Sequence, residues 1–541
     1  MQTPKIFRLN MRHGVYLNTT ETQNMPRQQT AGHDAAPPDQ LRRKPHRALR
    51  KSAIGIGIPD WALWVVAIIV LINALSWALV GVFLRQDPNS WMLIGYIGVS
   101  LLLFRQALRW RAYSVAPIIF AFLFLISYPA RVALMEQFYA GFRSTAYLAS
   151  TGRFSYSTSE FTQFYLVSLI GVFGLHFGSS LALKLFRDIS FNQRIDSRVW
   201  PVSFINICSL WCIASLLLSA ICYALGIGLA GVDPPSLPFR LTGILNIARM
   251  FLMPLCGWFL FGSAVDRGDK RATLLIVVFL LLHGLLAVFL TLSKAGLLLA
   301  VFPFLAYICI RAPRSRFNNR LLLSLGSIII LLLPITFFGA MVLREDIYTQ
   351  QYQSRGSAFN TAVSDNIGDG AHMFELLYGT MASASSRITG GSELMAVVAA
   401  PSFPSALVLT MITGRGALLD SGAAAMFNEV FEIELVVAGG MYSGKALGLF
   451  GTLFLSGNHF IVFFGSAFFA GLIVWLELCI GKIANQGAAC GAAFWLVGCV
   501  SESGFDLFAF YPPLLIGLYV LFKLFNQGQI KPLNRDVQRQ M

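Results

Sequence analysis

Three basic residues stand at the edges of, or inside, one long polar segment in an otherwise apolar chain. Lys294 lies in a tight turn between two apolar blocks, Arg344 closes the last block before the polar segment, and Arg387 lies within that segment. Cations held at one depth beside apolar sequence can bind phosphate groups through charge-assisted hydrogen bonds. The simpler alternatives are that Lys294 snorkels to an interface, that Arg344 anchors a helix end, and that Arg387 pairs with Glu375 or Glu393.

Two residues of the same segment are candidates for proton transfer. His372 and Glu375 stand at positions i and i+3 of a stretch that predicts an amphipathic helix, so they share one face. Histidine is the side chain that most readily accepts a proton near neutral pH. His459, which follows the segment, is a rival for this role. The alternative for His372 is a surface or packing position.

Two further cations lie on one apolar block that begins near residue 241. Arg240 precedes the block on the same side as Lys294, and Arg249 lies about two helical turns deeper. An arginine inside a membrane span is costly and is a functional candidate by default. We therefore add Arg240 and Arg249 to the candidate phosphate-binding residues. The alternative for Arg249 is structural pairing with a neighbouring helix.

The polar segment 344–446 is the part of the chain that these residues surround. It is Gly-rich, cannot span lipid, and holds five Lys or Arg against ten Asp or Glu in a protein of net charge +15. A loop of this length is usually functional rather than a connection.

The elements that must position these residues are membrane helices. The chain has 541 residues, of which 56% are hydrophobic and 12% charged, whereas a soluble domain has about 25% charged residues. The apolar blocks are about 18 to 25 residues long, the length that crosses a bilayer as a helix. The composition predicts an all-α polytopic membrane protein. The eight cysteines all fall in apolar blocks, so neither disulfides nor a zinc site is expected.

We predict about twelve spans and five regions. The spans are 61–84, 91–105, 113–130, 161–184, 202–230, 241–265, 272–292, 295–311, 321–343, 447–478, 487–503 and 506–524. The regions are a disordered basic tail (1–58), nine spans (59–343), the polar segment as a large helical loop (344–446), three spans (447–526) and a C-terminal tail (527–541).

The distribution of basic residues predicts the topology. The tail 1–58 carries ten Lys or Arg against three acidic residues, and the Lys and Arg clusters recur in every second connection between spans. By the positive-inside rule, both termini are cytoplasmic and the loop 344–446 lies outside. The basic excess therefore reflects topology and does not indicate nucleic acid. A bacterial inner membrane, with the loop in the periplasm, is the simplest compartment.

Chemistry on the outer face must use a substrate that carries its own activation. The chain has no P-loop, no dinucleotide-binding fingerprint and no HExxH motif, so no cofactor or metal is expected. A polyprenyl diphosphate sugar supplies its own leaving group. Its site needs cations near the headgroups and one group to deprotonate the attacking hydroxyl.

Three short motifs together resemble a known family. Ser293-Lys294-Ala295-Gly296 forms a short outer turn, an arginine segment surrounds Arg387, and Gly448-Leu449-Phe450-Gly451-Thr452-Leu453-Phe454 follows the loop. This pattern is similar to that of the Wzy-type oligosaccharide repeat-unit polymerases and, more loosely, to that of the O-antigen ligases. The resemblance covers about 60–524.

The resemblance implies a fold, an activity and partners. The fold would be GT-C-like, and the activity a metal-independent inverting glycosyl transfer between undecaprenyl diphosphate-linked repeat units. Lys294, Arg344 and Arg387 would bind the diphosphate, and His372 or Glu375 would accept the proton. The implied partners are the lipid-linked glycan, the bilayer, and a chain-length regulator and flippase of the same pathway.

Other functions fit parts of the pattern. A ligase that moves the finished glycan to another acceptor would use the same chemistry. A transporter or flippase predicts paired repeats and short loops, but the chain shows no internal repeat and has one loop of about a hundred residues. A mannosyltransferase-type enzyme would place an acidic pair in the first outer loop, where Glu136 and Glu160 are far apart.

Overall fold

The computed structural model describes the following parts of the chain: residues 60–85, 88–111, 113–125, 158–186, 203–228, 237–291, 302–304, 307, 391–399, 402, 436–437, 441–442 and 448–503. These residues are helical apart from turns and one antiparallel pair of two-residue strands, β1 (Val436–Val437) and β2 (Met441–Tyr442). The predicted all-α class is confirmed for the described residues.

The helices appear along the chain as follows. They are α2 (Asp60–Val80), η2 (Gly81–Arg85), α3 (Pro88–Trp110), α4 (Ala116–Leu125), α7 (Thr158–Phe186), α8 (Phe204–Ala224), η4 (Pro238–Arg240), α9 (Leu241–Ile247), η5 (Ala248–Leu252), α10 (Met253–Arg267), α11 (Lys270–Thr291), α16 (Gly391–Ala399), α19 (Gly448–Phe454), α20 (His459–Ile483) and α21 (Gln486–Ser503).

Six helical stretches are long and apolar enough to cross a membrane, and each coincides with a predicted span. They are Ser90–Trp110, Ser159–Phe186, Phe204–Ala224, Leu241–Arg267, Lys270–Val288 and His459–Lys482. In addition, α2, α4 and α21 overlap the predicted spans 61–84, 113–130 and 487–503. The predicted spans 321–343 and 506–524, most of 295–311, and the tails 1–58 and 527–541 lie outside the described residues.

Two predicted spans have different bounds in the structure. The span 91–105 is part of the longer helix α3, which begins at Pro88 and continues through Arg105 to Trp110. Proline suits the first turn of a helix, and arginine is favourable near the C-terminal end. The span 447–478 is divided into α19 and α20. Gly457 has a φ of +68° between them, and the Asn458 side chain accepts a hydrogen bond from Phe460 N at 2.9 Å and so caps α20.

Three helices, α3, α7 and α20, run parallel to one another. Gln106 near the end of α3 donates a hydrogen bond to Ser180 near the end of α7. At the other end, Gln163 near the start of α7 lies 3.0 Å from His459 at the start of α20. The short helix α4 runs the opposite way, because its first residues meet Glu477 near the end of α20.

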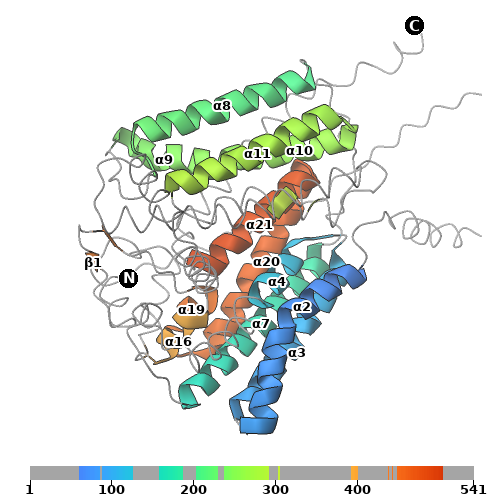
Figure 1. Ribbon diagram of the computed structural model, residues 1–541, viewed down its shortest axis with the longest axis vertical. Helices are drawn as coiled ribbons and strands as arrows, with labels where there is room; N and C mark the ends of the chain where they lie inside the picture. Colours follow the sequence, from blue (N-terminus) through green and yellow to red (C-terminus); the bar gives the residue numbers. More distant parts are fainter. Residues whose placement is uncertain are drawn as a thin grey trace, which may run out of the picture. The chain divides into compact units, whose positions relative to one another are not determined.

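The remaining helices alternate in direction as well. Arg267 at the end of α10 lies over the Phe204 ring at the start of α8, with its guanidinium carbon 4.6 Å from the ring centroid. Asn485, just before α21, donates to Ser263 near the end of α10 at 3.1 Å. In Figure 1, α21 lies between α10 and α20, and it packs against both.

These directions place the exposed basic residues of the described helices at one end of the bundle. This basic end holds Arg105, Arg109, Lys184, Arg267, Lys270, Arg271 and Lys482. The N-termini of α7 and α20 lie at the opposite end. The helix directions therefore agree with the alternation that the basic clusters predict.

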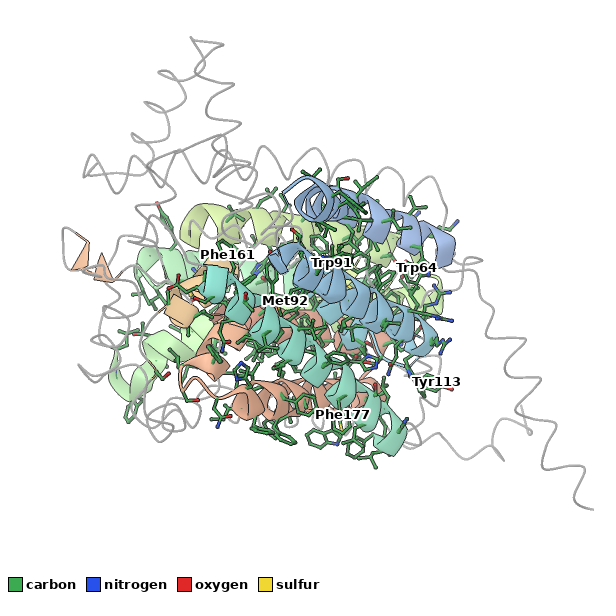
Figure 2. All side chains as sticks on the ribbon, turned by 90° about the horizontal axis from the view of Figure 1, so that it is seen from below. Trp64, Trp91, Met92, Tyr113, Phe161 and Phe177 are labelled. Atoms are coloured by element: carbon green, nitrogen blue, oxygen red, sulfur yellow. The ribbon has the colours of Figure 1, made fainter. Side chains whose placement is uncertain are left out.

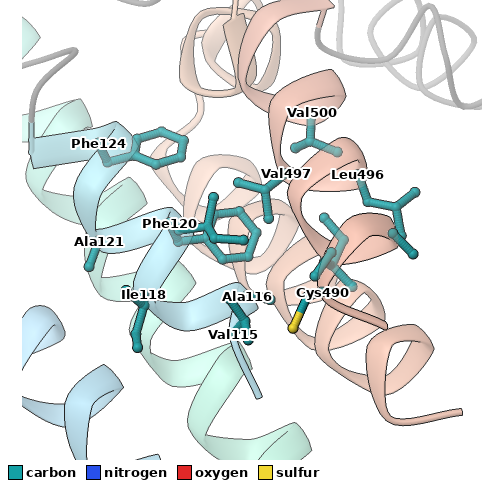
Figure 3. Packing of buried hydrophobic residues seen from close by; sticks show 14 of the residues in the cluster. Val115, Ala116, Ile118, Phe120, Ala121, Phe124, Cys490, Leu496, Val497 and Val500 are labelled. Carbon is teal, nitrogen blue, oxygen red and sulfur yellow. The ribbon is translucent and has the colours of Figure 1, made fainter. Parts of the chain in front are cut away.

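Aromatic side chains fill much of the space between the helices. The core between α4 and α21 contains Phe120, Phe124, Leu496 and Val497 (Figure 3), all at most 2% exposed. Other aromatic residues face away from the bundle: Figure 2 labels Trp91 on α3, which is 63% exposed. Exposed apolar side chains along the middle of these helices fit contact with lipid tails.

Glycines allow α7 and α20 to approach closely, which gives a first prediction. A Cβ atom at Gly178 would collide with the backbone carbonyl of Ala467 on α20. Gly178→Ala should therefore lower the free energy of unfolding by about 1–3 kcal/mol through overpacking, measured by thermal unfolding of the detergent-purified protein. Gly98→Ala on α3 is the matched control, since a Cβ there meets nothing within 4 Å. Equal stability of the two variants would contradict this packing.

Candidate functional site

Most of the predicted site residues lie outside the described residues. These are Lys294, Arg344, His372, Glu375 and Arg387, whose roles stay predictions. Arg240 ends η4, so its backbone position is known. Arg249 lies in η5 and is described fully. Of the seven predicted site residues, the structure therefore describes only Arg240 and Arg249.

A polar pair marks the end of the bundle that lies opposite the basic end. Gln163 Nε2 on α7 and His459 Nε2 on α20 are 3.0 Å apart, and both side chains are half-buried. The Phe454 ring lies edge-on to the imidazole, with ring centroids 5.2 Å apart. We call this pair the Gln163–His459 site. His459, the rival proton acceptor of the sequence, thus has a fixed hydrogen-bonding partner on another helix.

The turn between α19 and α20 brings the polar segment to this site. Gly457 adopts a left-handed backbone conformation, and a Cβ atom there would lie 2.6 Å from the Ser402 hydroxyl. Only glycine adopts this conformation at little cost. Ser456 Oγ is buried in the same turn, without a hydrogen-bond partner among the described residues. The turn is therefore packed against residues of the polar segment immediately before His459.

Helix α16, from the same polar segment, packs onto the membrane helices here. It contacts α19 and α7 (Figure 1). Leu394, Met395 and Val397 on α16 are at most 5% exposed and belong to the main core. Helix α16 of the polar segment is therefore part of the same packed core as α19 and α7.

Arg249 is held in a turn of widened helix. Pro254 has no N–H, so the carbonyl of Met250 loses its usual helical partner, and the five residues Ala248–Leu252 form a π-helical turn. Such turns often occur at functional sites. Arg249 within this turn is only 2% exposed.

The Arg249 guanidinium donates hydrogen bonds to the turn that follows α8 and to α9. Nη1 donates to Ile227 O at 3.2 Å, and Nη2 donates to Gly228 O at 3.3 Å and to Asn246 Oδ1 at 3.2 Å. These bonds hold the turn after α8 against α9. This environment matches the structural alternative for Arg249, and the predicted diphosphate contact remains a prediction. Arg240 and Arg249 are nine positions apart on one helical stretch, or about 13 Å.

The two histidines inside spans differ in their surroundings. His283 Nδ1 on α11 lies 3.2 Å from Ser215 Oγ on α8, a contact that joins two helices. His176 Nδ1 on α7 is buried and has no hydrogen-bond partner among the described residues. Neither histidine belongs to the Gln163–His459 site.

The sequence interpretation missed one buried carboxylate. Glu477 on α20 is 0% exposed and accepts hydrogen bonds from Val115 N at 2.7 Å, from Ala116 N at 3.0 Å and from Ser114 Oγ. It therefore caps the N-terminus of α4 from another helix, where a negative charge is favourable. Its position inside the predicted span 447–478 was the available signal, since acidic residues in spans are rarely without a role.

The described part of the chain contains neither a metal-binding cluster nor a disulfide between the cysteines whose side chains are described. Within it, no group of three or more His, Cys, Asp or Glu residues is placed to hold a metal ion. The six cysteines whose side chains the structure describes are free thiols.

The chain was also compared with known proteins. Neither the protein-family models nor the curated proteins nor the solved structures give a match.

Proposed function

We propose that this protein polymerises undecaprenyl diphosphate-linked oligosaccharide repeat units at the outer face of a bacterial inner membrane, for an exopolysaccharide, capsule or O-antigen. It would do so as a GT-C-like protein of about twelve spans, with both termini in the cytoplasm. The segment 344–446 would form the working face in the periplasm.

The observation that best supports this proposal is the docking of α16. This helix of the polar segment packs on α19 and α7, at the end of the bundle opposite the basic residues and beside His459. A connecting loop would have no need to bury Leu394 and Met395 in the core of the helix bundle. Burial of α16 against the membrane helices supports a working role for the segment at this end of the bundle, where we expect the diphosphate of a lipid-linked substrate to bind.

The proposed reaction is a single inverting displacement. Lys294, Arg344 and Arg387 would stabilise the charge that develops on the departing diphosphate. His372 or Glu375 would take the proton from the attacking sugar hydroxyl. The mechanism uses no metal, so loss of activity in EDTA would count against it.

Deletion of the gene tests the proposal through the lipid-linked intermediates that accumulate. A polymerase deletion is expected to accumulate single repeat units on the carrier, exposed at the outer face, and to produce no polymer. The measurement is mass spectrometry of extracted lipid-linked glycans, with complementation by the wild-type gene as control. Accumulation of finished lipid-linked polymer would instead identify a ligase, and accumulation of units facing the cytoplasm would identify a flippase.

A further inference from the structure

We propose that His459, oriented by Gln163, accepts the proton from the attacking hydroxyl in the polymerisation reaction. This assignment rests on the proposed function. It gives His459 the role predicted for His372 or Glu375, and it adds Gln163 as a positioning residue.

The first argument is the geometry of the imidazole. One ring nitrogen, Nε2, is paired with the Gln163 amide at 3.0 Å. In the structure the amide nitrogen faces Nε2; turning the amide over would bring its oxygen there, where it accepts from Nε2–H. In that arrangement Nδ1 holds a lone pair, and it has no hydrogen-bond partner among the described residues. The same bond is kept when Nδ1 becomes protonated, which suits a group that cycles between two protonation states.

The second argument is the convergence of independent segments on this ring. The Phe454 ring, which ends α19, contacts the imidazole edge-on. Asn458 caps α20 and fixes its first residue, His459. Ser402 of the polar segment lies against Gly457. The imidazole is thus contacted directly by Gln163 of α7 and by Phe454 of α19, while Ser402 lies against the turn that precedes it. The histidine is half-buried, at the end of the bundle where we expect the substrate headgroup.

The third argument is the buried hydroxyl of Ser456, in the turn before His459. Ser456 Oγ lies in the turn that leads to His459, and it lacks a hydrogen-bond partner among the described residues. Unpaired buried hydroxyls are costly in a structure that exists only for packing. A polar group that joined this turn when substrate binds would give the serine a hydrogen-bond partner.

The chemistry balances without a further reactant. The acceptor oxygen bonds to the anomeric carbon of the donor glycan as the bond from that carbon to the diphosphate oxygen breaks. The electron pair of the broken bond leaves with the diphosphate. The proton of the acceptor hydroxyl moves to His459 Nδ1 and is later released to water.

The test measures polymer formation by purified protein in liposomes that contain lipid-linked repeat units. His459→Gln is expected to lower the rate by about 10²-fold or more at pH 7, because general base catalysis contributes about 10²–10⁴-fold. His176→Gln on α7 is the matched control and should keep the wild-type rate. Thermal unfolding of each variant shows whether the fold survives.

The pH dependence of the polymerisation rate distinguishes a catalytic role of His459 from a purely structural one. The wild-type rate should fall at low pH, because a protonated imidazole cannot accept a proton, and the residual rate of His459→Gln should lack this fall. Gln163→Glu should move the fall toward higher pH, because a carboxylate at this position favours the protonated imidazole. The other carboxylates on elements packed here are Glu160 on α7, Glu393 on α16 and Glu477 on α20, of which Glu477 caps α4 near the opposite end of α20.

The outcomes distinguish this assignment from the function it rests on. If the wild-type protein makes no polymer from the lipid-linked units, the proposed function fails. If the wild-type protein is active and His459→Gln stays within a few-fold of its rate, or keeps the wild-type pH profile, only the His459 assignment fails. Full activity of His459→Gln beside an inactive His372→Gln would return the proton acceptor to the polar segment.

Discussion

Replacing Lys294 or Arg387 by alanine is expected to lower polymer formation by about 10²–10³-fold, which corresponds to about 3–4 kcal/mol of lost transition-state stabilisation per residue. The reason is that negative charge grows on the diphosphate as the glycosidic bond forms. A cation fixed near the headgroups stabilises that charge most strongly where water is excluded. The measurement is polymer length and amount in cells that express each variant, with membrane levels of the protein measured in parallel.

Matched controls separate this effect from a general effect of charge. Lys184→Ala and Arg105→Ala remove exposed cations at the basic end of the bundle and should leave polymer formation unchanged. Lys294→Arg should keep more activity than Lys294→Ala, because it keeps the charge. Normal chain length in both Lys294→Ala and Arg387→Ala would remove the proposed diphosphate site.

The second large effect is expected on stability, from Glu477→Ala. This change would leave three buried donors at the start of α4 without their acceptor, namely the backbone N–H groups of Val115 and Ala116 and the Ser114 hydroxyl. Loss of a helix cap costs about 0.5–2 kcal/mol, and a buried unsatisfied donor costs about 1–3 kcal/mol. Glu477→Ala should therefore lower the free energy of unfolding by about 2–4 kcal/mol, measured by thermal unfolding in detergent.

Two neighbouring variants check the cause. Glu477→Gln keeps one oxygen acceptor but turns an NH₂ group toward the remaining donors, so its stability should fall between those of wild type and Glu477→Ala. Ser114→Ala removes one donor and leaves both backbone bonds, so it should cost about 1 kcal/mol. A Glu477→Ala protein with the wild-type melting temperature would show that the cap carries no stability.

The presence of the helices could be read from the sequence, whereas the breaks between them could not. Hydrophobic length predicts α7, α8, α11 and most of α20, because any apolar stretch of this length must satisfy its backbone internally in lipid. The turn at Gly457 looked like part of one long span, since its neighbours are apolar. Its break depends on Asn458 as a cap and on the close approach of Ser402, which is distant in sequence.

The sequence predicted which kinds of residue belong to the candidate site, but only partly which of them lie together in space. The sequence singled out His459 as a rival proton acceptor, and the structure adds its partner Gln163, nearly three hundred positions away. Glu477 was overlooked for the same reason, since its three donors belong to another helix. The Arg249 contacts with Ile227 and Gly228 likewise depend on how α8 and α9 fold together.

By itself, the sequence determined that this protein is an all-helical membrane protein whose helices alternate in direction, because hydrophobic length and the placement of Lys and Arg act locally along the chain. Only the tertiary structure decided which polar side chains meet. Gln163 reaches His459, and Glu477 reaches the start of α4, because close helix packing, as at Gly178, fixes one helix against another. Hydrogen bonds between distant segments depend on that packing and leave no periodic signal in the residue order.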